Sequence, residues 1–262
     1  MLCVDIVDII LSYADAEVLY ENLFVSKDVN NITKETQLYK ELSKFNKLNQ
    51  KVTFGSAIDI GNLFVIKYLY TRDNPKINKS VFRLTCRYGH LEVAKWLYSL
   101  NMIDVNDEYA FCYSCEYGHL EVAEWLYSLG NIDIHVDNKA PIRYSCRNGH
   151  LEVAKWLYSV FDKPINLNKI GVLSLSCERG HLEVAKWLYS LDNVNIHIDN
   201  DDAFRASCCY GYIELAKWLY SLGNVDIHFD NNAVFRQSCN NGHFKVAEWL
   251  YSLPNNNFKY TK

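Results

Sequence analysis

The chain lacks three features that mark other classes of protein. No stretch approaches the roughly 18 consecutive apolar residues that a membrane-spanning helix needs. Basic residues are not in excess, because the net charge is −4 and the pI is near 6.1, so no global field attracts nucleic acid or acidic lipid. The start, Met1 to Asp8, carries acids where a signal peptide would carry basic residues. We therefore expect a soluble cytoplasmic protein with no nucleic-acid or membrane partner.

Motifs of catalysis are also missing. The sequence contains no glycine-rich phosphate loop, no paired carboxylate site and no basic patch. A catalytic thiol would be one distinct cysteine beside a base, whereas six of the nine cysteines occupy equivalent positions. We therefore predict that the protein is not an enzyme and holds no cofactor or metal.

What the sequence does contain is a repeated segment, first complete as Gly-His-Leu-Glu-Val-Ala-Lys-Trp-Leu-Tyr-Ser-Leu at 89–100. A diverged copy occupies 61–70, and close copies begin at Gly118, Gly149, Gly180, Gly211 and Gly242. Successive repeat glycines are 28, 29, 31, 31, 31 and 31 residues apart. A fixed period of this size predicts a solenoid of stacked units.

Each copy has the same internal pattern. A short first helix precedes the repeat glycine, which supplies the left-handed conformation that ends the helix. A second helix follows the glycine, and Glu92 and Lys95 on it should face water and pair. The stripe expected to be buried comprises Leu91, Val93, Ala94, Leu97 and Leu100, joined by Trp96.

A polar connection follows each second helix. It contains Asp-Ile-His or Asn-Ile-His and then Asp-Asn, which suits a turn and the cap of the next helix. The Asp-Asn pairs are Asp137-Asn138, Asp199-Asn200 and Asp230-Asn231.

The repeating unit resembles the ankyrin repeat. It consists of a helix, a Gly-His turn, a second helix and a polar loop, and it recurs about every 31 residues. The resemblance covers residues 50–262 and implies an all-α solenoid of about seven helix-turn-helix repeats that binds proteins without catalysis. The repeats are expected at 50–78, 79–107, 108–138, 139–169, 170–200, 201–231 and 232–262. The short connections and the Trp-Leu-Tyr-Ser-Leu ending look most like the ankyrin proteins that giant DNA viruses encode in large sets.

Residues 1–49 lie outside the repeats and are expected to form a short helical N-terminal module. Asp5 to Asp15 and Leu23 to Lys27 resemble an F-box. That resemblance implies binding to the adaptor protein Skp1 through Ile6, Ile9 and Ile10, and hence a substrate adaptor of a ubiquitin ligase. The alternative is a polar-faced helical cap that shields the first repeat from solvent.

The cysteines and tryptophans recur in step with the repeat glycines. Cysteines three residues before the glycines, such as Cys86 and Cys115, should be too far apart in stacked repeats for disulfides. Cys86 with His90 has zinc-ligand chemistry, but the alternative is a buried thiol and a histidine that satisfies backbone groups. Trp96 and its equivalents could stack on bases, although their helical phase favours the core.

The two residues before each repeat glycine vary although the second helices hardly change. In the resembling family this pair lies on the concave face where partners bind. Variation on one face of a uniform stack is what specific recognition requires, although drift at solvated positions would look the same. The candidate protein-binding residues are Arg87, Tyr88, Glu116, Tyr117, Arg147, Asn148, Glu178, Arg179, Tyr210 and Asn240.

Together these patterns predict a monomeric, non-catalytic interaction module. Its sharper form is an F-box–ankyrin adaptor that holds Skp1 and a target. Its alternative is a plain ankyrin scaffold, or a competitive inhibitor of a host protein, with no Skp1 binding. If the chain is viral, we expect it in the host cytosol.

Overall fold

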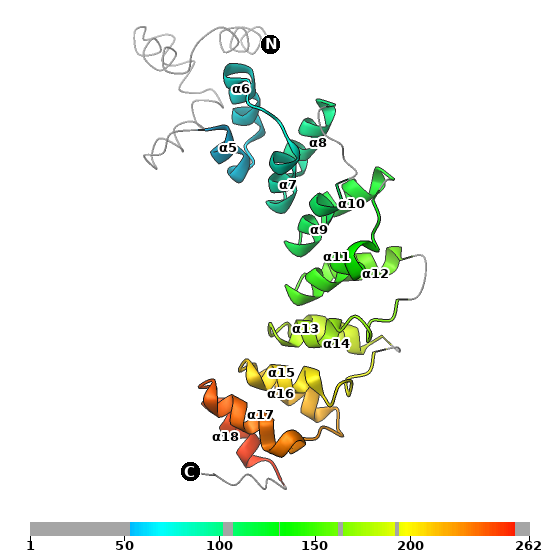
Figure 1. Cartoon of the computed structure of the whole chain (residues 1–262), viewed down its shortest axis with the longest axis vertical. Coiled ribbons are helices and arrows are strands. Elements are labelled where there is room, and N and C mark those ends of the chain that lie inside the picture. Colours follow the sequence, from blue (N-terminus) through cyan, green and yellow to red (C-terminus); the bar gives the residue numbers. More distant parts are fainter. Residues whose placement is uncertain (1–52, 102–106, 131, 162–164, 192–193, 255–262) are drawn as a thin grey trace, which may run out of the picture. The chain divides into compact units, whose positions relative to one another are not determined.

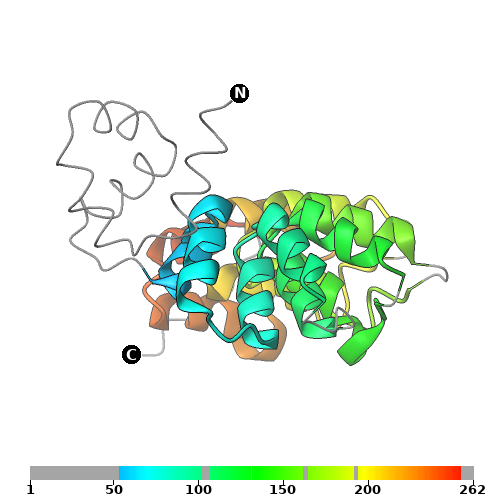
Figure 2. The same ribbon diagram turned by 90° about the horizontal axis from the view of Figure 1, so that it is seen from above.

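The computed structural model describes residues 53–101, 107–130, 132–161, 165–191 and 194–254. Within these ranges every regular element is a helix, and helices and loops alone make up the ribbon (Figure 1 and Figure 2). The predicted all-α architecture is therefore confirmed. The N-terminal module and its Ile6, Ile9 and Ile10 lie outside the described residues.

The helices fall into two compact units that divide between Ala110 and Phe111, inside helix α9 (Glu108–Glu116). The first unit contains α5 (Phe54–Ile60), α6 (Leu63–Asp73), α7 (Lys79–Arg87) and α8 (Leu91–Ser99). The second unit contains α10 (Leu120–Ser128), α11 (Val136–Arg147), α12 (Leu151–Val160), α13 (Val172–Cys177), α14 (Leu182–Tyr189), α15 (Asp202–Cys209), α16 (Ile213–Ser221), α17 (Phe229–Asn240) and α18 (Phe244–Ser252).

In the second unit the helices form stacked antiparallel pairs. Each first helix packs against its own second helix and against the next first helix, so that α11, α13, α15 and α17 follow one another (Figure 1). The core lies between them. Each first helix contributes an apolar residue and a cysteine to this core. Phe204 and Cys208 of α15 are examples, and both are at most 1% exposed. The interior between successive pairs is therefore mainly apolar.

The repeat glycine ends each first helix as the sequence predicts. Gly118 has φ 81°, a conformation that costs other residues steric strain. The chain closes there with two hydrogen bonds, from Gly118 N to Cys115 O at 3.3 Å and from His119 N to Ser114 O at 2.8 Å. These two bonds satisfy carbonyls at the helix end.

The buried apolar stripe of the second helices contains fewer residues than the sequence predicts. Val93, Ala94 and Leu97 are at most 1% exposed, whereas Leu91 and Leu100 are half-buried. The predicted pair is confirmed, because Lys95 Nζ lies 3.0 Å from Glu92 Oε1. Both side chains are largely exposed, so the pair contributes roughly 0.2–0.5 kcal/mol.

The tryptophans are not in the interior, and this corrects the expectation from their helical phase. All six are half-buried and lie in the seam between successive second helices. Each of five indoles meets the edge of a tyrosine from the preceding pair, an arrangement that aromatic rings favour. The centroid distances are 5.4 Å for Tyr70–Trp96, 5.7 Å for Tyr127–Trp156, 6.0 Å for Tyr158–Trp187, 5.9 Å for Tyr189–Trp218 and 5.7 Å for Tyr220–Trp249.

Asp199-Asn200 forms a turn as predicted, but it does not cap the following helix, and Asp137-Asn138 lies inside α11 rather than in a turn. Asp199, Asn200 and Asp201 are all left-handed, with φ of 50°, 58° and 59°, which Asp and Asn tolerate better than most residues. A capping residue needs extended backbone, so Asp201 makes no capping bond to α15. Its carboxylate accepts instead from Asp226 N at 3.0 Å and lies 2.6 Å from His197 Nδ1.

Successive pairs also meet where an aromatic ring lies over the repeat glycine. The imidazole of His181 covers Gly149 so tightly that a Cβ on this glycine would overlap Nδ1. His90, His150 and His243 cover Gly61, Gly118 and Gly211 in the same way, and Tyr212 covers Gly180. The ring also bonds the preceding pair, because His90 Nε2 donates to Asp59 O at 3.1 Å.

Replacing Gly149 with alanine tests this contact. Gly130 is the matched control, because its φ is 82° against 81° for Gly149 and nothing lies within 4 Å of its added Cβ. Gly130→Ala should cost about 1–2 kcal/mol of unfolding free energy from the backbone alone. Gly149→Ala should cost a further ~1–3 kcal/mol because the ring must move. Denaturant unfolding of both variants measures this, and equal losses would contradict the contact.

The aromatic seam should give a measurable coupling between Tyr127 and Trp156. A double-mutant cycle with Tyr127→Ala and Trp156→Ala should yield about 0.5–1.5 kcal/mol. Because the indole is only half-buried, Trp156→Ala should cost less than the ~3–5 kcal/mol of a fully buried tryptophan. A coupling energy of zero would show that the two rings do not interact.

Candidate functional site

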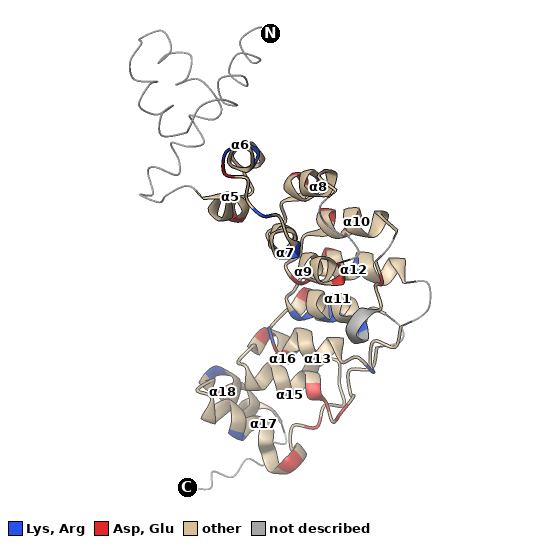
Figure 3. Ribbon diagram, turned by 45° about the horizontal axis from the view of Figure 1, so that its top comes forward, with Lys and Arg blue, Asp and Glu red and all other residues tan. Residues whose placement is uncertain are grey.

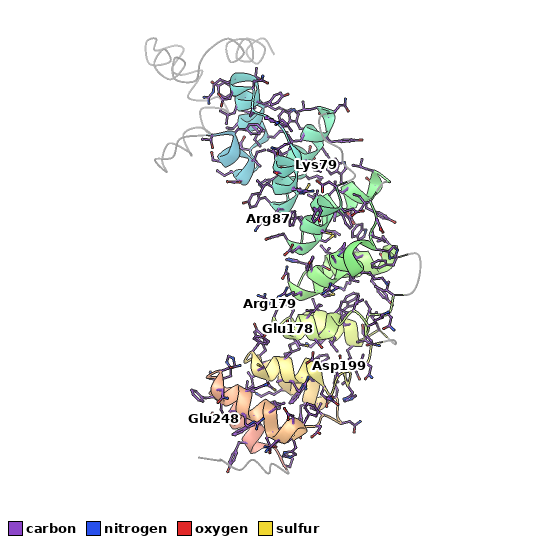
Figure 4. All side chains as sticks on the ribbon, viewed as in Figure 1. Lys79, Arg87, Glu178, Arg179, Asp199 and Glu248 are labelled. Atoms are coloured by element: carbon purple, nitrogen blue, oxygen red, sulfur yellow. The ribbon has the colours of Figure 1, made fainter. Side chains whose placement is uncertain are left out.

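The candidate binding residues all lie at the C-terminal ends of first helices. Tyr88 and Tyr117 are 41% and 39% exposed, and Tyr210 is 53% exposed. Arg179 and Asn240 are also exposed, while Arg87, Glu116, Arg147, Asn148 and Glu178 are half-buried. Glu178 and Arg179 project from the end of α13 that lies away from Asp199 (Figure 4).

One of these residues also has a structural role. Asn148 Nδ2 donates to Glu116 O at 2.9 Å and so ties α11 to the preceding first helix. Asn241, which the candidate set omits, repeats this bond to Cys209 O at 2.9 Å. An asparagine just before the repeat glycine therefore closes the stack, which leaves less of its side chain for a partner.

A third position belongs to the same surface and is missing from the sequence-based set. The residue five before each glycine precedes the variable pair by three and four residues, so all three lie on one helix face. Helical spacing alone could have revealed it. These residues are Leu84, Tyr113, Tyr144, Leu175, Ala206 and Gln237, and Leu84 is 36% exposed. We call the residues at five, two and one positions before each repeat glycine the variable face.

The variable face of the second unit carries charges that the fold leaves unpaired. Glu116, Arg147, Glu178 and Arg179 form no ion pair within the described part of the chain. By contrast, Arg205, one position outside this face, contacts Asp202 at 2.8 Å and lies over Phe229. Acidic and basic positions are both scattered over the described helices, with neither sign confined to one of them (Figure 3). The free charges are thus available to an external group.

Comparison with known families fits this architecture. A model described as Ankyrin repeats (3 copies) matches residues 54–140, 82–169 and 142–231. The chain belongs to the ankyrin-repeat family. Its repeats make it a protein–protein interaction module, and the ankyrin fold is typically non-catalytic.

Solved structures show the same fold. The human ASB11 ankyrin repeat domain matches with a TM-score of 0.54 and 17% identity, covering 78% of this chain and 100% of that one. At this identity the likeness concerns the fold alone. No curated protein matches the sequence. No described helix is long and apolar enough to cross a membrane.

The fully buried cysteines of the ankyrin first helices are unreactive thiols. Burial raises the pKa of Cys177 to about 12 and raises the pKa of Cys86, Cys146 and Cys208 still further. Such thiols stay protonated at neutral pH and are poor nucleophiles and ligands. All eight cysteines in the described ranges are free.

The histidines of the Gly-His turns serve the backbone, as the alternative to zinc predicts. His90 donates to Asp59 O, and His150 and His181 bond the main chain of Glu116 and Arg147. No cluster of three or more His, Cys, Asp or Glu residues suited to a metal occurs among the residues that the structure describes. These rings therefore join repeats.

Two of these histidines should make stability depend on pH. Burial lowers the pKa of His150 and His181 from the ordinary value of 6.5. The unfolded chain therefore binds protons more readily than the folded chain as pH falls through 6.5. Unfolding free energy should decline from about pH 7 until pH passes below the folded pKa, where this contribution levels off.

Replacing both histidines with tyrosine should flatten this decline, because Tyr212 fills the same position over Gly180 and does not titrate in this range. Denaturant unfolding between about pH 7.5 and 5 measures the slope for both proteins. An unchanged slope in the double variant would remove these histidines as the cause.

Proposed function

We propose that the protein binds a partner protein through the variable face of its first helices, the face expected to be concave in this family. The observation that carries the proposal is the contrast within each repeat. Second helices repeat almost unchanged, whereas the position two before the glycine runs Arg87, Glu116, Arg147, Glu178, Cys209 and Asn240. Distinct side chains at equivalent positions permit discrimination between partners.

The chemistry of this face suits protein recognition. Tyr117 and Tyr210 are exposed rings, and Arg147 and Arg179 carry charges with no ion pair of their own among the described residues. Tyrosine and arginine are enriched among the residues that dominate binding energy. Interleaved charges of both signs also reject partners with the wrong charge pattern.

The test compares exposed aromatic residues on a first helix and on a second helix of the second unit. Tyr210→Ser, combined with Arg179→Ser, should weaken binding of a partner captured by the wild-type chain by at least about tenfold. Phe244→Ser is the control, because Phe244 is 65% exposed but lies on second helix α18. Titration calorimetry with the purified partner measures both. A larger loss from Phe244→Ser would place the interface elsewhere.

The N-terminal pattern from Asp5 to Asp15 favours a second, finer function, that of an F-box adaptor. Residues 1–49 would hold Skp1 of a ubiquitin ligase, and the variable face would hold the target, a host protein if the chain is viral. The competing proposal is a plain scaffold or competitive inhibitor that does not bind Skp1.

Replacing Ile9 and Ile10 with aspartate separates these two functions. Burying unpaired carboxylates in an apolar interface is strongly unfavourable, so an adaptor should lose Skp1 in a pull-down while its melting temperature stays unchanged. If residues 1–49 are only a cap, the wild type should bind no Skp1 and the variant should melt earlier. Absence of Skp1 from the wild-type pull-down would refute the adaptor.

A further inference from the structure

An arginine stands six positions before the repeat glycine in four of the first helices. These residues are Arg83, Arg143, Arg205 and Arg236. The fold supplies an acid to two of them, because Arg83 Nε lies 2.8 Å from Asp107 Oδ2 and Arg205 Nη2 lies 2.8 Å from Asp202 Oδ1. Arg236 donates to a main-chain carbonyl. The side chain of Arg143 has no ion pair or hydrogen bond among the residues that the structure describes.

The acids that would neutralise Arg143 are replaced in its own repeat and in the next. The residue three positions before it is Ala140, whereas α15 has Asp202 at this place. Eleven positions before the next repeat glycine stands Lys169, whereas Asp107 holds the equivalent place after Arg83. Helix α11 therefore keeps the arginine but neither of the acids that pair with it elsewhere.

A second arginine lies on the same face of α11. Arg147 follows Arg143 by four residues, so the two side chains are neighbours on the helix surface. The Nε atom of each is buried without a hydrogen-bond partner. Arg205 has the same buried Nε, and its terminal nitrogen makes the contact with Asp202. The terminal nitrogens of Arg143 and Arg147 are therefore the groups that an external carboxylate would meet.

Glutamates on the neighbouring first helices limit what can bind at this arginine pair. Glu116 on α9 and Glu178, directly after α13, hold the same repeat position as Arg147. Helix α11 adjoins both, because Asn148 Nδ2 donates to Glu116 O and α11 packs against α13 (Figure 1). Packed helices lie about 8–10 Å apart. A run of acidic residues crossing the stack would meet these glutamates, whereas a single acid on α11 would not.

We propose that the partner protein docks on α11 through one aspartate or glutamate, whose carboxylate binds Arg143 and Arg147. This inference rests on the proposed function and names the chemistry that the partner brings to the variable face. The planar guanidinium of arginine matches a carboxylate in shape as well as in charge. The partner's carboxylate takes on this pair the role that Asp202 has on Arg205.

Selection from a random peptide library displayed on phage, against the full chain, tests the proposal without knowledge of the partner. Retained peptides should share one acidic position. Arg143→Gln combined with Arg147→Gln should weaken their binding by at least about tenfold without lowering the melting temperature. Lys155→Gln combined with Lys186→Gln is the matched control. It removes the same two charges from second helices and should change the affinity by less than about twofold.

A change in the peptide tests the same contact on the unaltered chain. Replacing the shared acid with its amide should weaken binding to the wild type by at least about tenfold and leave binding to the double arginine variant nearly unchanged. Equal losses for the two proteins would overturn the proposal. So would a peptide that binds more than about tenfold tighter with phosphoserine in place of the acid, because its occupant would be a phosphorylated segment.

The selection also separates this inference from the proposed function. Peptides that depend on Tyr210 and Arg179 but share no acidic position, or that carry acidic runs insensitive to the arginine variant, would overturn the carboxylate contact alone. Peptides insensitive to both Tyr210→Ser and Arg179→Ser, or no retained peptides at all, would overturn the proposed function as well.

Discussion

A flat ring lying over a glycine is the contact on which the rest of this stack depends. The glycine is needed twice, because its positive φ ends the first helix and its missing Cβ leaves room for the next repeat. His181 over Gly149 shows both requirements at one position. The imidazole also bonds the main chain of the preceding pair, so one side chain sets both the spacing and the register between repeats.

This contact explains why some positions repeat and others vary. The Gly-His turn, the Val-Ala-Leu stripe and the aromatic seam all contact a neighbouring repeat, so a change in any of them disturbs two units. The variable face makes fewer such contacts, Asn148 with Glu116 being one exception. Because nearest-neighbour packing carries the stability of a repeat array, side chains such as Tyr210 and Arg179 are free to serve recognition.

Much of the fold could be predicted from the sequence because the repeat period constrains it. The helices, the left-handed glycines and the Glu92–Lys95 pair follow from local rules of spacing and conformation. The half-buried tryptophans could not be predicted, because one helix's periodicity does not reveal how a neighbouring repeat covers it. The left-handed conformation of Asp199 to Asp201 could not be predicted for a similar reason. The carboxylate of Asp201 accepts a hydrogen bond from the backbone amide of Asp226, which is 25 residues away in the sequence.

The candidate site was predicted in part. Variation between copies identified the residues next to each glycine, but it did not show that Asn148 closes the stack. Tyr113 belongs to the same face because it precedes the variable pair by three and four residues, so its position follows from helical spacing although it is not adjacent to the glycine. Predictions for Ile6, Ile9 and Ile10 depend on residues outside the described ranges and stay predictions.

Native-state hydrogen exchange on His181→Ala tests most directly whether the ring-over-glycine contact joins each repeat to the next. The variant should lose amide protection in α11 to α14, the two pairs that this ring connects, while α17 and α18 keep theirs. Protection lost equally across the whole second unit, or unchanged in α11 to α14, would contradict the account.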